Sequence, residues 1–152
     1  MFEMMRFTHY LIAALLMATP ALAQSVQTKQ YDDGGIYEGQ FLGGLQHGQG
    51  TYTLPHGYQY DGEGFEGEIR GNGMARFPNG SLYEGQFAAG KPEGFGVINF
   101  ADGGTYEGDW LDGKITGRGI ARYANGVVYE GDFRNAMHHG QGTMTSPGGY
   151  IY

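Results

Sequence analysis

The side chains of this sequence that could bind a metal ion are a few histidines. His138 and His139 are adjacent, and His47 and His56 lie far earlier in the chain. Neighbouring residues of a strand point to opposite faces, so an adjacent pair is poorly placed to hold one ion. We therefore interpret these histidines as solvated loop residues and predict no metal site.

A series of acidic residues is the next candidate for chemistry. Its members recur at a constant interval and are Glu38, Asp61, Glu84, Glu107 and Glu130. Calcium needs six to eight oxygens that converge on one point, whereas a ladder spreads its carboxylates out. Glu107 and Asp109 could form the carboxylate pair of a glycosidase, but a spacing of two follows from the repeat itself. The ladder favours a solvated face over a catalytic or calcium site.

Other catalytic patterns are weak or missing. The chain has no cysteine, so thiol nucleophiles and cysteine-based zinc sites are excluded. Residues 44–51 (GLQHGQGT) loosely resemble a phosphate loop, but they lack its lysine and lead into a strand rather than a helix. We predict no catalytic residue, no cofactor and no enzymatic activity.

The acids belong to an internal repeat with a period of 23 residues. Tyrosine occurs at 37, 60, 83, 106, 129 and 152, and an acid and a glycine follow each of the first five. An aromatic residue comes two positions after that glycine in four units, whereas unit two has Gly64 there. Each unit then has a Gly-x-Gly, such as Gly94 and Gly96 in unit three. The glycine excess is therefore structural, and we reject disorder.

This pattern resembles the MORN (membrane occupation and recognition nexus) repeat. Unit three shows it fully in Tyr83-Glu84-Gly85-Gln86-Phe87, followed by Gly90 and the Gly-x-Gly. Unit two departs from it at Gly64 and unit five at Ala136, where we expect local distortion. The resemblance implies a protein-interaction scaffold and, as an alternative, a module that binds phospholipid head groups or a membrane surface.

The residue pattern predicts an all-β fold, an elongated, single-layer, twisted antiparallel sheet of stacked β-hairpin repeats. Alternation over residues 83–87 gives one strand, and residues 74–77, 97–100 and 120–123 give the preceding ones. Pro78-Asn79-Gly80 suits a three-residue hairpin loop. That loop places Tyr83 opposite Ala75, with Gly85 opposite Gly73 and Phe87 opposite Gly71. Five hairpins give about ten strands.

An aromatic stripe on one sheet face is the candidate binding site. Its members are Tyr83, Phe87, Tyr106, Trp110, Tyr129 and Phe133. These rings either pack repeat on repeat or remain partly exposed as a groove for a protein partner, and both can hold for different residues.

The first 23 residues differ from the repeats and are typical of a secretory signal peptide. An apolar run at 11–18 follows Arg6, and Ala21-Leu22-Ala23 forms a cleavage pattern before Gln24. An uncleaved anchor is the alternative. We predict export to the periplasm or the medium, a tail and capping turn at 24–36, and five repeats plus the first residue of a sixth at 37–152.

Charge limits the choice of partner. Removing residues 1–23 takes away one Glu and one Arg, so the net charge stays at −7. Nucleic acid would be repelled, and anionic lipid is disfavoured because lysine follows the mid-repeat glycine only at Lys91 and Lys114. An open strand edge at the C-terminus would permit a homodimer, unless Tyr150 to Tyr152 folds back.

Overall fold

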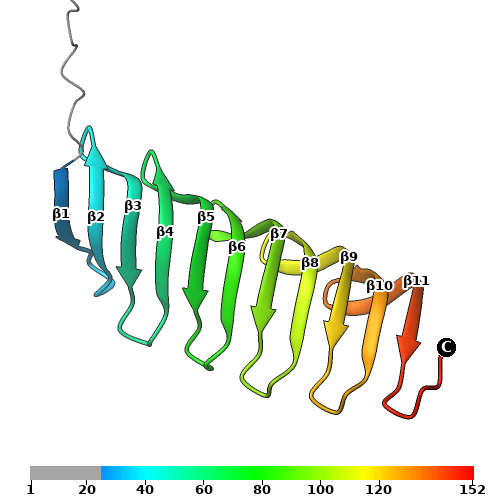
Figure 1. The fold of residues 1–152 in the computed structure, drawn as a ribbon. Coiled ribbons are helices and arrows are strands. Elements are labelled where there is room, and N and C mark those ends of the chain that lie inside the picture. Colours follow the sequence, from blue (N-terminus) through cyan, green and yellow to red (C-terminus); the bar gives the residue numbers. More distant parts are fainter. Residues whose placement is uncertain (1–24) are drawn as a thin grey trace, which may run out of the picture.

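The computed structural model describes residues 25–152, which form one sheet of eleven strands in sequence order (Figure 1). The predicted signal peptide, residues 1–23, lies outside the described residues. The strands are β1 Ser25–Gln30, β2 Ile36–Leu42, β3 Leu45–Thr53, β4 Gln59–Phe65, β5 Glu68–Arg76, β6 Leu82–Ala88, β7 Lys91–Asn99, β8 Thr105–Leu111, β9 Lys114–Arg122, β10 Val128–Arg134 and β11 Met137–Thr145. Every neighbouring pair is antiparallel, which confirms the predicted fold class.

The sheet has one strand more than the ten expected from five hairpins. The additional strand is β1, in the segment that the sequence suggested was a tail. Thr28 of β1 pairs with Glu38 of β2. One period of 23 residues later, Thr51 of β3 pairs with Asp61 of β4 in the same way. Strand β1 therefore occupies the place of a repeat strand, and the predicted turn follows it at Asp33-Gly34. No helix long and apolar enough to cross a membrane occurs between residues 25 and 152.

The three-residue loop and its register are as predicted. Phe77 N–H donates to Ser81 O across the loop at 2.9 Å, and Gly80 adopts the left-handed φ of 90° that such loops require. Across β5 and β6, Ala75 faces Tyr83, Gly73 faces Gly85 and Gly71 faces Phe87. The strands before the loops start earlier than expected, since β7 runs from Lys91 to Asn99.

A bulge and a two-residue turn account for these longer strands. Between β6 and β7 the pairing moves from Gly85↔Gly96 to Phe87↔Pro92, so three residues of β7 face Gln86 alone. The Gln86 side chain accepts a hydrogen bond from Phe95 N–H at 2.8 Å and satisfies this otherwise unpaired donor. Equivalent side-chain bonds come from Gln40, Glu63, Asp109 and Asp132.

The turn that follows each bulge requires left-handed backbone. Ala89 and Gly90 have φ of 49° and 78°, as in a type I′ hairpin turn. In unit five Ala136 replaces the glycine and still adopts a φ of 63°. The predicted distortion at Ala136 is therefore wrong, because the neighbouring strands hold the turn although the residue carries a Cβ.

The repeated tyrosine lies across a pair of facing glycines. A Cβ on Gly96 would come within 3.0 Å of the Tyr83 ring, and a Cβ on Gly85 would come within 3.0 Å of Gly96 Cα. The Tyr83 hydroxyl donates to Gln86 O at 2.8 Å, and the other four repeat tyrosines bond the carbonyl three residues later. Each ring is thus fixed over backbone that only glycine allows.

Burial of these tyrosines predicts alkaline unfolding. Burial raises the pKa of Tyr83 and Tyr106 to about 12 from the ordinary 10.0. The unfolded chain loses its tyrosine protons first, so the stability from these residues is complete below pH 10 and disappears as the pH rises towards 12. Urea unfolding followed by circular dichroism along this range should show the decline. A free energy of unfolding that stays constant between about pH 9 and pH 12 would contradict it.

Edge-to-face aromatic contacts join the units into one core. Ring centroids of Tyr60 and Phe87 are 4.9 Å apart, those of Phe87 and Tyr83 are 5.1 Å apart, and those of Tyr83 and Trp110 are also 5.1 Å apart. The series continues through Tyr106, Phe133 and Tyr129. It does not include Tyr37 and Phe41, which pack on each other. The interruption falls where unit two has Gly64.

We expect Gly64→Phe to stabilise the protein by about 1 kcal/mol through added apolar burial and aromatic contacts. A Cβ at position 64 meets Glu68 O at 3.5 Å and Gln46 at 3.7 Å, which are ordinary contacts. The new ring would join Tyr37 to Tyr60 and make the core continuous. Differential scanning calorimetry should show a higher Tm, and hydrogen exchange should show more protection in β2 and β3. An unchanged or lower Tm would contradict the expected packing.

The C-terminal residues fold back on β11. Met144 N–H donates to Tyr152 O, Tyr152 N–H donates to Met144 O, and Thr145 pairs with Ile151. This contact covers only the end of β11, and the strand is exposed from Met137 to Thr143.

Candidate functional site

All six residues of the predicted aromatic binding stripe are buried. Their exposed fractions lie between 0% and 7%, in the order Tyr83 0%, Phe87 4%, Tyr106 1%, Trp110 7%, Tyr129 6% and Phe133 5%. The structure therefore brings them together as the core rather than as a free face, because each ring packs against those of the neighbouring units. A contact surface on this side must use residues at the rim of the core.

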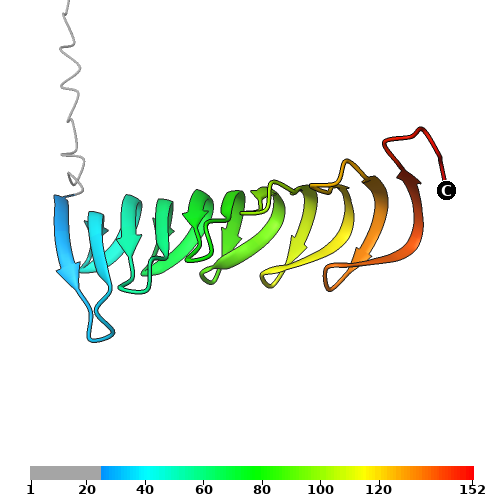
Figure 2. The same cartoon turned by 90° about the horizontal axis from the view of Figure 1, so that it is seen from below.

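That rim surrounds a trough on the inner face, the face that carries Tyr83 and its equivalents. The strands are curved, as the view from below shows (Figure 2). One wall is the series of two-residue turns, which bond to one another: Gly90 N–H donates to Ile69 O and Gly113 N–H donates to Pro92 O. The other wall is the series of three-residue loops, where Phe100 is 38% exposed and Tyr123 is 42% exposed.

The trough contains a hollow near each end. The N-terminal hollow has a volume of about 380 Å³ and is lined by Tyr31, Gln46, Tyr52, Gly67, Glu68, Ile69, Ala89 and Gly90. The C-terminal hollow has a volume of about 240 Å³ and is lined by Phe100, Asp102, Gly104, Thr105, Tyr106, Ile115, Ala121, Arg122, Tyr123, Ala124, Phe133 and Ala136. Both are bounded mainly by aromatic and aliphatic side chains.

The two hollows occupy equivalent places in the array. Four lining residues of one correspond to four of the other at a difference of 69, which is three periods of 23: Tyr31 and Phe100, Gln46 and Ile115, Tyr52 and Ala121, Gly67 and Ala136. Equivalent positions of the repeat therefore form a hollow near each end of the trough.

Three side-chain positions decide whether such a place is open. At the C-terminal hollow they carry Gly104, Ala121 and Phe133. The residues three periods earlier are Gly35, Tyr52 and Gly64, and of these Tyr52 lines the N-terminal hollow. Between units two and three, Tyr58 stands at the Gly104 position and packs on Phe77 at 5.7 Å. Between units three and four, Ile98 and Trp110 stand at the other two positions and are each 7% exposed. Bulky residues therefore close the middle of the trough.

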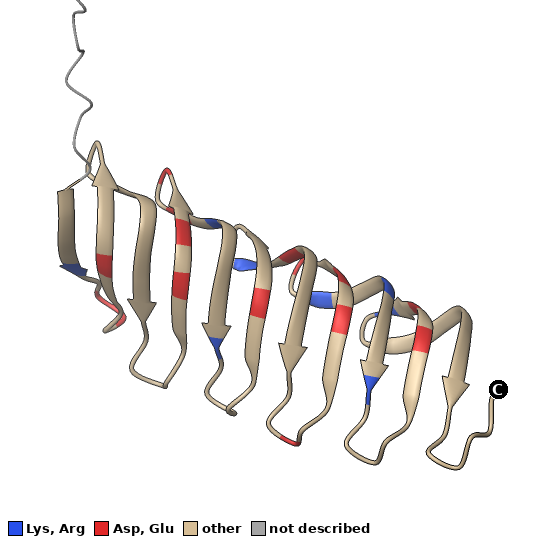
Figure 3. Ribbon diagram, in the orientation of Figure 1, with Lys and Arg blue, Asp and Glu red and all other residues tan. Residues whose placement is uncertain are grey.

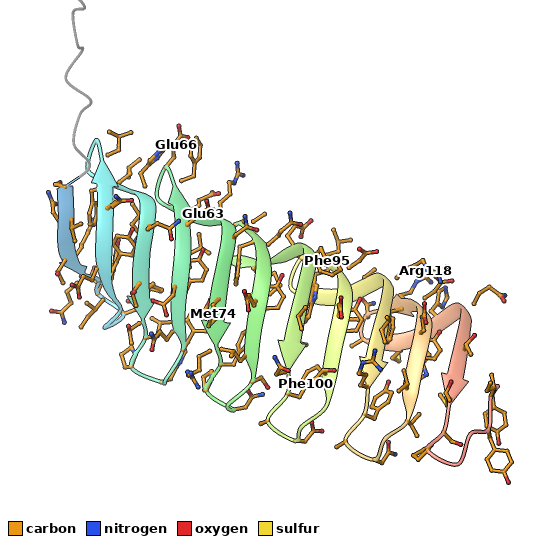
Figure 4. The ribbon with its side chains drawn as sticks, viewed as in Figure 1. Glu63, Glu66, Met74, Phe95, Phe100 and Arg118 are labelled. Carbon is orange, nitrogen blue, oxygen red and sulfur yellow. The ribbon has the colours of Figure 1, made fainter. Side chains whose placement is uncertain are left out.

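The outer face offers a different surface. Acidic residues recur on every even-numbered strand (Figure 3), and the five ladder acids are all exposed. Some of these acids lie opposite apolar residues of the next strand: Met74 faces Glu84 and Val97 faces Glu107. Met74 and Phe95 are 39% and 51% exposed on this face (Figure 4). No group of three histidine or acidic side chains in residues 25–152 is arranged to hold a metal ion.

His47, His56 and the His138–His139 pair lie apart from one another, and the interpretation of that pair as loop residues is wrong, because both residues lie in β11. His138 stacks on Tyr129 at 3.7 Å, and its Nε2 is 2.6 Å from the Tyr123 hydroxyl. His47 contacts Phe65, and His56 accepts a bond from Tyr58 N–H. These contacts give His138 a place at the end of the aromatic core.

The repeat geometry agrees with the comparison to known families. The MORN repeat profile matches residues 37–57, 60–82, 83–105, 106–128 and 129–149. The chain belongs to the MORN repeat family. No curated protein matches the sequence.

The solved structures similar to this chain include two TCP domains. The TCP domain of Drosophila melanogaster SAS-4 (dCPAP), in complex with a proline rich motif of Ana2 (dSTIL), has a TM-score of 0.50 and 19% identity, and the match covers 82% of this chain and 68% of that chain. The TCP10 domain of Danio rerio CPAP, in complex with a STIL peptide, has a TM-score of 0.23 and 16% identity over 84% and 57%.

Proposed function

We propose that this MORN protein is a non-enzymatic scaffold that binds a protein partner through its inner trough. The observation that supports this most is the pair of apolar hollows, of which the C-terminal one lies beside the exposed rings of Phe100 and Tyr123. Apolar surface with a polar rim is typical of protein interfaces. The SAS-4 TCP domain, which shares the fold, is itself solved with a bound peptide motif, and this supports the proposal.

Site-specific photo-crosslinking in cells tests the trough against the outer face. A photoreactive amino acid at Phe100 lies on the trough wall, and one at Phe95 lies on the outer face with similar exposure. We expect one protein partner to be captured from position 100 and not from position 95. Capture from position 95 alone would move the interface to the outer face, and capture from neither would refute the scaffold function.

Membrane-surface binding is the alternative that the family resemblance suggested. The structure gives it little support, because Lys91 Nζ lies 3.1 Å from Asp112 Oδ1. An ion-paired lysine attracts anionic lipid less than a free one. Co-sedimentation of the protein with anionic liposomes, together with no capture from Phe100, would favour this alternative.

Export is part of the proposal and rests on the apolar run at 11–18 with its cleavage pattern. Expression of the full chain in a Gram-negative bacterium should yield, in the periplasm or the medium, a protein whose N-terminal residue is Gln24. Recovery of uncleaved protein in the cytoplasm would contradict export.

Self-association through β11 is a second candidate interaction. The outer edge of residues 137–143 is exposed, and antiparallel pairing of two such edges about a two-fold axis would give a closed dimer. Light scattering that gives the monomer mass across micromolar concentrations would rule out this dimer.

A further inference from the structure

The spacing of the two hollows suggests what kind of partner the trough accepts, an inference that rests on the proposed function. Corresponding residues of the hollows are three repeats apart, which is six strands. At about 4.8 Å per strand the hollows lie about 29 Å apart. An extended polypeptide advances about 3.3 Å per residue, so residues about nine apart along it would reach both hollows.

The shape of each hollow favours an aromatic side chain. The N-terminal hollow lacks the ring that Phe87, Trp110 and Phe133 provide at the position of Gly64. The C-terminal hollow lacks the ring that Tyr58 provides at the position of Gly104. A ring inserted into either place would meet the edges and faces of rings already present, such as Tyr52 or Tyr123.

Charge at the hollows favours a basic partner. The loop at each hollow carries an aspartate, Asp33 or Asp102, whereas the two loops between them carry His56 and Asn79 at that position. Each aspartate accepts a bond from the N–H two residues later at 2.8 Å through Oδ1. Oδ2 of Asp33 also accepts a 3.3 Å bond from the Tyr52 hydroxyl.

Further charges near the hollows are of both signs, since Lys29 Nζ lies 5.1 Å from the ring centroid of Tyr31 at the N-terminal hollow. Glu68 lines the N-terminal hollow and forms a 3.8 Å surface ion pair with Arg70. Arg122 borders the C-terminal hollow, but it follows the inward-facing Ala121 and therefore points to the outer face. With a net charge of −7 on the chain, association with a cationic segment would be favoured at long range.

We propose that the trough binds an extended basic polypeptide whose two aromatic side chains, about nine residues apart, fill the two hollows, each beside a lysine or arginine that meets the local aspartate. The aromatic anchors supply most of the affinity, and the aspartates select for positive charge. Since both anchors belong to one peptide, the second binds at a high effective concentration once the first has bound.

Fluorescence anisotropy with synthetic peptides tests this proposal. The probe is a labelled glycine-serine peptide with two Phe-Lys pairs about nine residues apart; controls of the same composition have the pairs about five apart, or Phe-Glu in place of Phe-Lys. We expect the first peptide to bind at least tenfold more tightly than either control, since two anchored side chains bind cooperatively. Equal affinity for the two spacings would overturn the two-anchor arrangement, and equal affinity for Phe-Lys and Phe-Glu would overturn the charge selection.

Variants that close one hollow provide the second arm. Ala121→Ile places the residue of unit three at the C-terminal hollow, and Gly64→Phe closes the N-terminal hollow. Each should reduce the affinity of the nine-residue probe at least tenfold without lowering Tm, whereas Val97→Ile on the outer face should not. Wild-type affinity in both closed variants would overturn the proposal. If the peptide experiment fails but a partner is still captured from position 100, the scaffold function stands and only the two-anchor proposal is refuted. If the peptide experiment fails and no partner is captured, both proposals are refuted.

Discussion

We expect Trp110→Ala to cost about 4 kcal/mol of unfolding free energy and to divide the array into two unfolding units. The Trp110 ring lies 5.1 Å from Tyr83 and 5.6 Å from Tyr106, so it is the contact that joins the aromatic rings of units three and four. Its Nε1–H also donates to Gly96 O at 3.2 Å, and removal of the side chain would leave this buried carbonyl with one bond fewer.

Urea unfolding followed by far-ultraviolet circular dichroism measures this effect. Two transitions should replace one, because repeat proteins are held together by contacts between neighbouring units. Leu111→Ala is the matched control, since Leu111 is the next residue and is 56% exposed, and its effect should stay within about 0.5 kcal/mol. A single transition at the wild-type midpoint would show that Trp110 does not couple the units.

The sequence allowed the local register to be predicted because three residue types recur at fixed spacing. A turn glycine such as Gly80, a tyrosine such as Tyr83 and an aromatic such as Phe87 define both the loop length and the inner face. The observed pairing of Ala75 with Tyr83 follows from these residues alone. Five copies at one constant period made this inference strong, since each unit supports the same alignment.

Burial of the aromatic face could not be predicted in the same way. It depends on the curvature that the bulges introduce, and a bulge exists only once two strands have paired. Gln86 gave a weak signal, because a polar residue recurs at that position, but only the structure shows its bond to Phe95 N–H. The hollows were also hidden, since Gly104, Ala121 and Phe133 are separated in sequence and meet only in the folded array.

The glycine beneath each tyrosine gives the second large expected effect. Gly96→Ala should reduce the free energy of unfolding by about 3 kcal/mol, at the upper end of the usual cost of overpacking. The added Cβ would lie within 3.0 Å of the Tyr83 ring. That ring cannot move away easily, because Tyr83 is fully buried, contacts Phe87 and Trp110, and donates a hydrogen bond to Gln86 O.

A double-mutant cycle separates this clash from a general effect of losing glycine. Gly64→Ala is the control, because a Cβ there meets only ordinary contacts at 3.5 Å or more, and it should cost little. In a Tyr83→Leu background, Gly96→Ala should cost far less than in the wild type, since the ring that opposes the new methyl group is gone. Equal costs in both backgrounds would mean that the backbone at Gly96, rather than the tyrosine above it, requires glycine. The tyrosine and the glycine of each MORN unit would then be independent features rather than two halves of one contact.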